Sequence, residues 1–168
     1  MPTHHLDALL ADIVRGWAPP AFDDSRRWSY GDVENNGIYY HPQLTHYAHQ
    51  VFEQFFFTET GIQYADLSGR DPRHSEARSN HRPPITERLT FPVLWLHQWM
   101  IEPMEAGDVF HTWIDTVDLT EERIAVRAHV FKEDRERAAL VIWVRVAKDL
   151  DLEKRTVPIP DWFPRRKM

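Results

Sequence analysis

The segment from Pro42 to Gly61 constrains the fold of this chain most, because it has a helical repeat with too many large apolar side chains for a surface helix. Apolar residues recur there every three to four positions and form one broad face. They are Leu44, Tyr47, Ala48, Val51, Phe52 and Phe55. Pro42 suits a first helical turn, and residues 58–61 end the helix. A helix that is apolar on most sides needs a curved sheet to cover it.

The second half of the chain supplies that sheet, since apolar and polar residues alternate over several strand-length stretches. The predicted strands are 85–102, with an interruption at Pro92, then 108–117, 124–131 and 138–147. Arg127 and His129 share one face of the third strand, and Trp143 and Arg145 share one face of the fourth. Short turns between the strands predict antiparallel pairing. The predicted class is α+β, with a long central helix wrapped by an antiparallel β-sheet.

Three further segments complete the expected organisation. Residues 6–17 predict a short added N-terminal helix that ends before Pro19, and residues 27–30 predict a short strand. Residues 66–84 are polar and arginine-rich and predict a long loop, which suggests a lid or a binding loop. The proline-rich tail, 156–168, is expected to lie extended along the surface.

Composition excludes several classes of protein. The chain has 168 residues, which suits a single domain over 1–168 with its core at about 25–162. A formal net charge of −6 argues against nucleic acid as a partner. The absence of cysteine excludes a disulfide scaffold, a thiolate nucleophile and a zinc–thiolate site. We find no signal peptide and no membrane-spanning stretch, so a cytoplasmic protein that does not bind membranes is expected.

One group of residues has the chemistry of a reaction site. Tyr30, Glu34 and His41 flank a turn that leads into the central helix. A carboxylate there can act as a general base or a nucleophile, and the helix start offers backbone N–H groups that can hold an oxyanion. The set suits hydrolysis of an activated acyl group. Asp32, two residues from Glu34, is the alternative acid. A packing role for Tyr30 and a plain helical role for His41 also stay open.

The segment Tyr30–Pro42 resembles the signature of hotdog-fold acyl-CoA thioesterases, especially the 4-hydroxybenzoyl-CoA branch and the branch associated with the Tol-Pal system. The acid three residues before a glycine is the catalytic carboxylate in these branches, and Glu34 precedes Gly37 by that spacing. The Tol-Pal branch places a tyrosine and a histidine where Tyr30 and His41 stand. Pro103 with Gly107-Asp108, and the segment 155–160, resemble later parts of the same pattern.

The resemblance implies the hotdog fold, a homodimer or homotetramer, and hydrolysis of an acyl-CoA or related acyl thioester to the free acid and thiol. The catalytic residues would be Glu34, His41 and Tyr30, and the amide near His41 would hold the oxyanion. The residues expected to bind substrate are Asn36, Gly37 and Tyr40. No cofactor is implied. A metal held by His46 and His49 is disfavoured, because no carboxylate stands at ligand spacing beside them.

Two departures from the family pattern bear on the function. The catalytic acid is usually Asp, whereas this chain has Glu34, and the segment 66–84 is longer than usual. The first keeps open a non-catalytic protein that binds an acyl ligand. Another hotdog enzyme, an acyl-carrier-protein thioesterase or a 3-hydroxyacyl thioester dehydratase, also stays open. Arginines in 66–84 offer a contact for the phosphates of coenzyme A, or simply a solvated loop.

Overall fold

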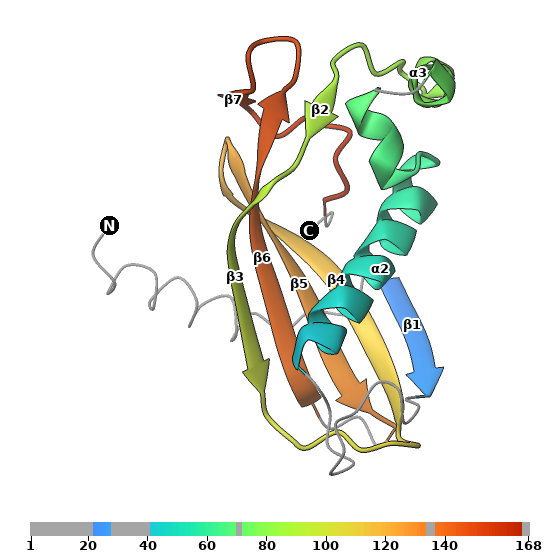
Figure 1. Cartoon of the computed structure of the whole chain (residues 1–168), viewed down its shortest axis with the longest axis vertical. Helices are drawn as coiled ribbons and strands as arrows, with labels where there is room; N and C mark the ends of the chain where they lie inside the picture. Colours follow the sequence, from blue (N-terminus) through green and yellow to red (C-terminus); the bar gives the residue numbers. More distant parts are fainter. Residues whose placement is uncertain (1–21, 28–40, 70–71, 134–136, 166–168) are drawn as a thin grey trace, which may run out of the picture.

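The computed structural model describes residues 22–27, 41–69, 72–133 and 137–165, and in it one long helix lies across one antiparallel sheet (Figure 1). In chain order the elements are β1 (Phe22–Arg27), α2 (His41–Thr60), the 3₁₀-helix η2 (Tyr64–Ser68), α3 (Pro72–Asn80), β2 (Leu89–Thr90), β3 (Val93–Met100), β4 (Val109–Thr120), β5 (Arg123–Lys132), β6 (Arg137–Asp149) and β7 (Arg155–Val157). The predicted N-terminal helix over 6–17 lies outside the described residues. No helix in the described part is long and apolar enough to cross a membrane.

The sheet confirms the predicted antiparallel meander for β4, β5 and β6, but it does not continue it to β3. β3 pairs with β6 and not with β4, the next strand in the chain, and Trp99 lies opposite Leu140. β1 pairs with β4 on the other side, so the described sheet runs β1-β4-β5-β6-β3. The short strands β2 and β7 both pair with the end of β6. β1 and β3 are therefore the outermost long strands of the described sheet.

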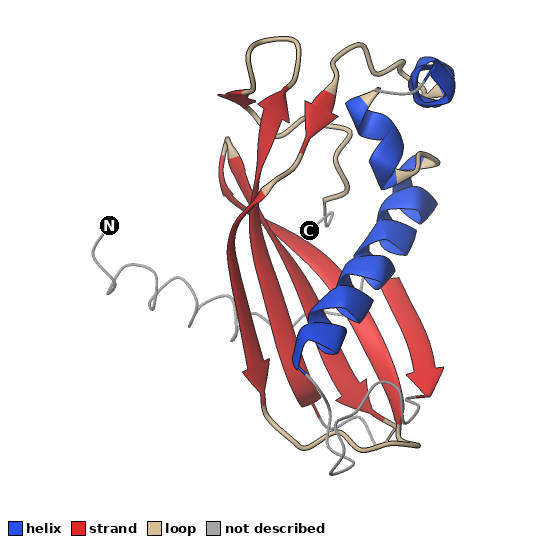
Figure 2. Ribbon diagram, in the orientation of Figure 1, coloured by secondary structure: helices blue, strands red, loops and turns tan. Residues whose placement is uncertain are grey.

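The core lies between α2 and one face of the sheet, as the two sequence periods predict (Figure 2). Buried residues of α2 recur at helical spacing, and the strands present every second residue to them. The helix contributes Leu44, Tyr47, Ala48, Val51, Phe52, Phe55 and Phe56, and the strands contribute Phe110, Ile114, Val126, Ala128, Val141 and Trp143. The opposite side of α2, with Gln50, Gln54 and Phe57, is exposed, so the sheet covers less of the helix than the sequence suggests.

A second set of buried residues lies on the sheet face turned away from α2. Ala125, Leu140 and Ile142 pack there with Trp95 and Trp99 of the edge strand. Arg127 and His129 share this face with Asp115, as the alternation in β5 predicts. The charges are buried with each other: the guanidinium of Arg127 donates two hydrogen bonds to the carboxylate of Asp115.

Residues 66–84 are not a long loop. The structure places η2 and α3 there, and both lie near the end of the sheet that carries β2 and β7 (Figure 2). Leu67 and Ile85 are buried and anchor the segment to the core. Buried Arg78 stabilises this segment, because its guanidinium donates a hydrogen bond to the Glu87 carbonyl at 3.0 Å. Helix α3 escapes detection from the sequence because its residues, Pro72–Asn80, have almost no apolar face.

Two smaller expectations are also corrected. The first strand is β1 at 22–27, upstream of the predicted 27–30, of which residues 28–30 lie outside the described part. The tail does not only follow the surface. Ile159 and Phe163 are buried, and the Phe163 ring packs against Phe91 with ring centroids 4.8 Å apart. The tail thus closes one end of the core.

Candidate functional site

Of the predicted reaction site, the described residues include only His41, at the N-terminal end of α2. The structure begins this helix at His41, the predicted histidine, which places that residue's backbone in the first helical turn. The other predicted site residues lie outside the described part of the chain. They are Tyr30, Glu34, Asn36, Gly37 and Tyr40, together with the alternative acid Asp32. Their roles therefore stay predictions.

The start of α2 has the electrostatic character that the prediction requires. The first N–H groups of a helix have no acceptor within it and form the positive end of its dipole. The first turn of α2 contains no acidic residue that would neutralise this end. One turn further along, the Thr45 hydroxyl donates to the side-chain carbonyl of Gln98 on β3 at 2.8 Å. This bond fixes the helix start against the edge strand. Such an end can polarise a carbonyl oxygen placed before it.

A second polar group lies deeper, around Arg145 of β6. The side chain is only 4% exposed and lies on the face that packs against α2. Its guanidinium donates to the Phe91 carbonyl at 2.8 Å, to the Tyr64 hydroxyl at 3.0 Å and, over a long 3.4 Å, to Nδ1 of His49. Its carbon lies 5.0 Å from the centre of the Phe52 ring. The alternation in β6 places Arg145 on the same face as Trp143, which packs in the core. A charged residue at such a core-facing position is the sequence signal for this buried polar group.

Burial and the guanidinium of Arg145 change the titration of two neighbours. Burial, helped by the charge of Arg145, lowers the pKa of His49 to about 4. His49 is therefore a neutral acceptor at neutral pH. Burial raises the pKa of Tyr64 to about 12 against the opposing effect of Arg145, so this phenol keeps its proton. The cluster is a buried cation surrounded by neutral partners.

His46 and His49 do not converge on a common ligand position. The ring of His46 hydrogen-bonds to Gln50 at 3.1 Å, while His49 faces Arg145 on one side and Glu53, at 3.7 Å, on the other. Among the described residues, no group of three potential metal ligands comes together. Of the loop arginines considered for phosphate contact, Arg78 is buried and bonded to a carbonyl, so it is not available for that role.

Comparison with solved structures defines the class of fold. The described architecture is the predicted hotdog fold, a long helix on an antiparallel sheet, and many solved chains share it. The 1,4-dihydroxy-2-naphthoyl-CoA thioesterase of Synechocystis superposes with a TM-score of 0.66 at 15% identity, over 84% of this chain and 90% of that one. A gentisyl-coenzyme A thioesterase gives 0.63 at 16% identity, over 84% and 98%.

A hypothetical protein from Staphylococcus aureus, solved in complex with CoA, gives a TM-score of 0.62 at 15% identity, over 84% of this chain and 78% of that one. No protein-family model and no curated protein sequence matches this chain. The similarity is thus one of fold, and it confirms the hotdog fold that the resemblance of the segment Tyr30–Pro42 implies.

Proposed function

We propose that this protein hydrolyses an acyl-CoA, or a related acyl thioester, with Glu34 as the catalytic carboxylate. The observation that carries the proposal is the start of α2 at His41, directly after the segment that contains Glu34. Only a few residues of chain separate the Glu34 carboxylate from a helix start whose first turn contains no acidic residue. Three chains that share the fold supply further support, because two are named CoA thioesterases and one was solved with CoA.

In this mechanism Glu34 either removes a proton from water or attacks the thioester carbon itself. Both routes place negative charge on the carbonyl oxygen, and the amide near His41 at the helix start stabilises it. The carbon–sulfur bond then breaks, and the thiol leaves with a proton. When water is the attacking group this step gives the free acid directly, whereas an acyl group bonded to Glu34 is released as the acid by a second attack, of water on the anhydride. Tyr30 and His41 orient the reacting groups or assist this proton transfer. Asn36, Gly37 and Tyr40 contact the substrate.

The test is thiol release over a panel of acyl-CoAs with wild-type protein and the Glu34→Gln variant. Loss of a positioned acid–base group lowers kcat by roughly 10²–10⁴, and we expect a decrease of that size. Glu34→Asp is also expected to be impaired, because a displacement of about 1 Å can cost about 10²-fold. Asp32→Asn is the matched control and is expected to keep its activity. An inactive Asp32→Asn with active Glu34 variants would move the assignment to Asp32.

We further propose that the protein forms a homodimer or homotetramer that pairs along β3. This strand is an edge of the described sheet, and apolar side chains on it are unusually exposed. Leu94 is 52% exposed and Leu96 45%. Exposed, apolar edge strands favour pairing with another chain. Because Gln98 of β3 holds the start of α2, a partner copy along β3 would lie close to the proposed reaction site.

A further inference from the structure

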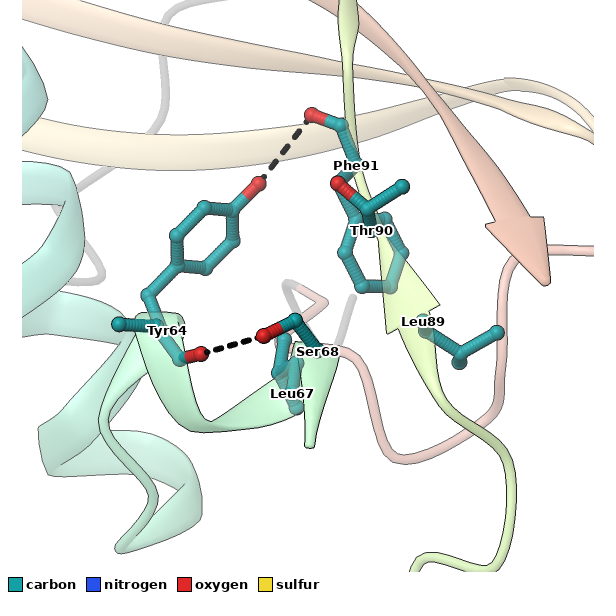
Figure 3. Close-up of a pocket in the computed structure, with 7 residues that line it drawn as sticks. Tyr64, Leu67, Ser68, Leu89, Thr90 and Phe91 are labelled. Carbon is teal, nitrogen blue, oxygen red and sulfur yellow. Dashed lines mark hydrogen bonds between the residues drawn. The ribbon is translucent and has the colours of Figure 1, made fainter. Parts of the chain in front are cut away.

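A pocket with a volume of about 250 Å³ opens between η2 and β2, and nothing above assigns a role to it. Apolar side chains and three hydroxyl-bearing residues line it (Figure 3). They are Tyr64, Leu67, Ser68, Leu89, Thr90 and Phe91. An apolar cavity of about 150 Å³ is enough to bind benzene. This pocket therefore has room for one ring or a short chain together with a small polar group.

Of the three hydroxyl-bearing residues that line this pocket, Tyr64 is the one that also contacts Arg145. Figure 3 shows its hydroxyl pointing to the carbonyl of Phe91, which it contacts at 3.2 Å. That is long for an O–H donor, since such bonds are usually about 2.5–3.0 Å, so the present bond is weak. The phenol ring is held in place by Phe52 and Phe56, each with its centroid 5.3 Å away. The hydroxyl is thus a fixed donor with a poor acceptor.

Arg145 lies behind this donor, and the described residues provide no counter-ion for it. In the part of the chain that the structure describes, no carboxylate lies within ion-pair distance of it, and its Nε has no hydrogen-bond partner. Its acceptors are all neutral, His49 included. Burying a cation without an opposite charge is costly. An anion next to Tyr64 would offset that cost, and the hydrogen bond from Arg145 strengthens the phenol as a donor.

We propose that this pocket binds a small monocarboxylic acid with one ring or a short chain. Its carboxylate would accept the Tyr64 hydroxyl in the field of Arg145, and its apolar part would pack between Leu67 and Leu89. A phosphate is a poorer fit, since it carries more charge and needs several donors. The site is separate from the proposed thioester centre of the same subunit. Tyr64 packs on Phe52 and Phe56, roughly 16–23 Å along α2 from His41 at about 1.5 Å per residue.

The test is calorimetric titration of the whole protein with benzoate and with benzamide, which has the same shape but no charge. We expect benzoate to bind and benzamide to bind at least about tenfold more weakly, because hydrogen bonds to charged groups are the stronger ones. Tyr64→Phe keeps the ring but removes the donor, and it should weaken benzoate binding by at least about tenfold. Tyr47→Phe, which removes a buried phenol that does not line the pocket, should bind as wild type does.

Three outcomes would overturn the proposal. They are no saturable binding of benzoate, equal binding of benzoate and benzamide, and wild-type affinity in Tyr64→Phe. Thermal unfolding of each variant shows whether it is folded, and Arg145→Gln provides a second variant should Tyr64→Phe fail to fold. No thioester is present in the titration, so its result does not depend on whether Glu34 is catalytic.

Discussion

At the scale of single residues, the most consequential feature is the buried cluster of Asp115, Arg127 and His129 on the sheet face turned away from α2. Asp115 and Arg127 are each 3% exposed, and His129 lies 3.6 Å from the same carboxylate. Burial alone raises the pKa of Asp115, but hydrogen bonds from His129 and Arg127 outweigh it and hold the pKa below its usual value. The charged form of Asp115 is therefore preferred more strongly in the folded state than in the unfolded one.

We predict that Asp115→Asn strongly destabilises the protein, by about 3–5 kcal/mol, because it leaves Arg127 buried without a counter-ion. Urea unfolding measures this change. The control is Asp118→Asn on the same strand, whose ion pair with Arg165 is half-exposed and should contribute at most about 1 kcal/mol. Equal effects of the two substitutions would contradict the prediction.

The lowered pKa of Asp115 also determines how the stability of the fold changes with pH. A carboxyl whose folded pKa is lowered stabilises the fold above its unfolded pKa of about 3.9. That contribution is lost as the pH falls from there through the lowered pKa of folded Asp115. The loss of stability in strong acid should therefore be smaller in Asp115→Asn than in wild type.

At the scale of elements, the segment between α2 and β2 depends on one close contact. Gly69 ends η2 with a φ of 56°, and a Cβ at this position would lie 2.7 Å from the guanidinium carbon of Arg78. That guanidinium is buried and bonded to the Glu87 carbonyl, so it has little freedom to move. The glycine thus lets the last turn of α3 pack closely against the end of η2.

We predict that Gly69→Ala lowers the free energy of unfolding by roughly 2–4 kcal/mol, the sum of left-handed backbone strain and overpacking. Gly61→Ala is the matched control. It also has a positive φ, 71°, but nothing lies within 4 Å of the position that a Cβ would take there. Only strain of about 1–2 kcal/mol applies at that site. A comparison of the two Tm values separates the contact from the backbone effect.

The elements that the sequence predicts are those whose burial produces a period. Alternation in β5 correctly predicts the faces of Arg127 and His129, and the helical repeat correctly predicts α2 with Phe52 on its buried side. Helix α3 lacks such a period, and it is held instead by polar contacts of Arg78, such as the hydrogen bond from its guanidinium to the Glu87 carbonyl. The pairing of β3 with β6 joins segments far apart in the chain, and the alternation of apolar and polar residues within each strand does not predict which strands pair.

The two candidate sites also differ in whether a local sequence pattern predicts them. The proposed reaction site follows from the spacing of Glu34 and His41 in one continuous segment, so the sequence alone predicts it. The pocket beside Tyr64 draws on Phe91 and Arg145, residues far apart in the chain. No local spacing joins them. Only the folded arrangement brings together a phenol and a guanidinium that has no carboxylate partner among the described residues.

At the scale of the whole molecule, the exposed edge at β3 predicts assembly. We expect the protein to sediment as a species heavier than its 20.0 kDa chain at micromolar concentration. Leu96→Lys places a charge on the edge strand and should shift the protein towards the monomer. Leu152→Lys, at an equally exposed position between β6 and β7, is the control and should leave the mass unchanged. A monomeric wild-type protein would refute this assembly.

The pairing of β3 also determines when the sheet can be completed during synthesis. The segment Val93–Met100 leaves the ribosome before β6, its partner strand, has been made. The strand therefore stays unpaired, with its apolar side chains exposed, while β4 and β5 are synthesised. A nascent chain is most open to non-native association during this interval, since unpaired strands and exposed apolar surface favour aggregation. Slower translation between Met100 and Arg137 would therefore lower the yield of folded protein, whereas a delay after Asp149 would not.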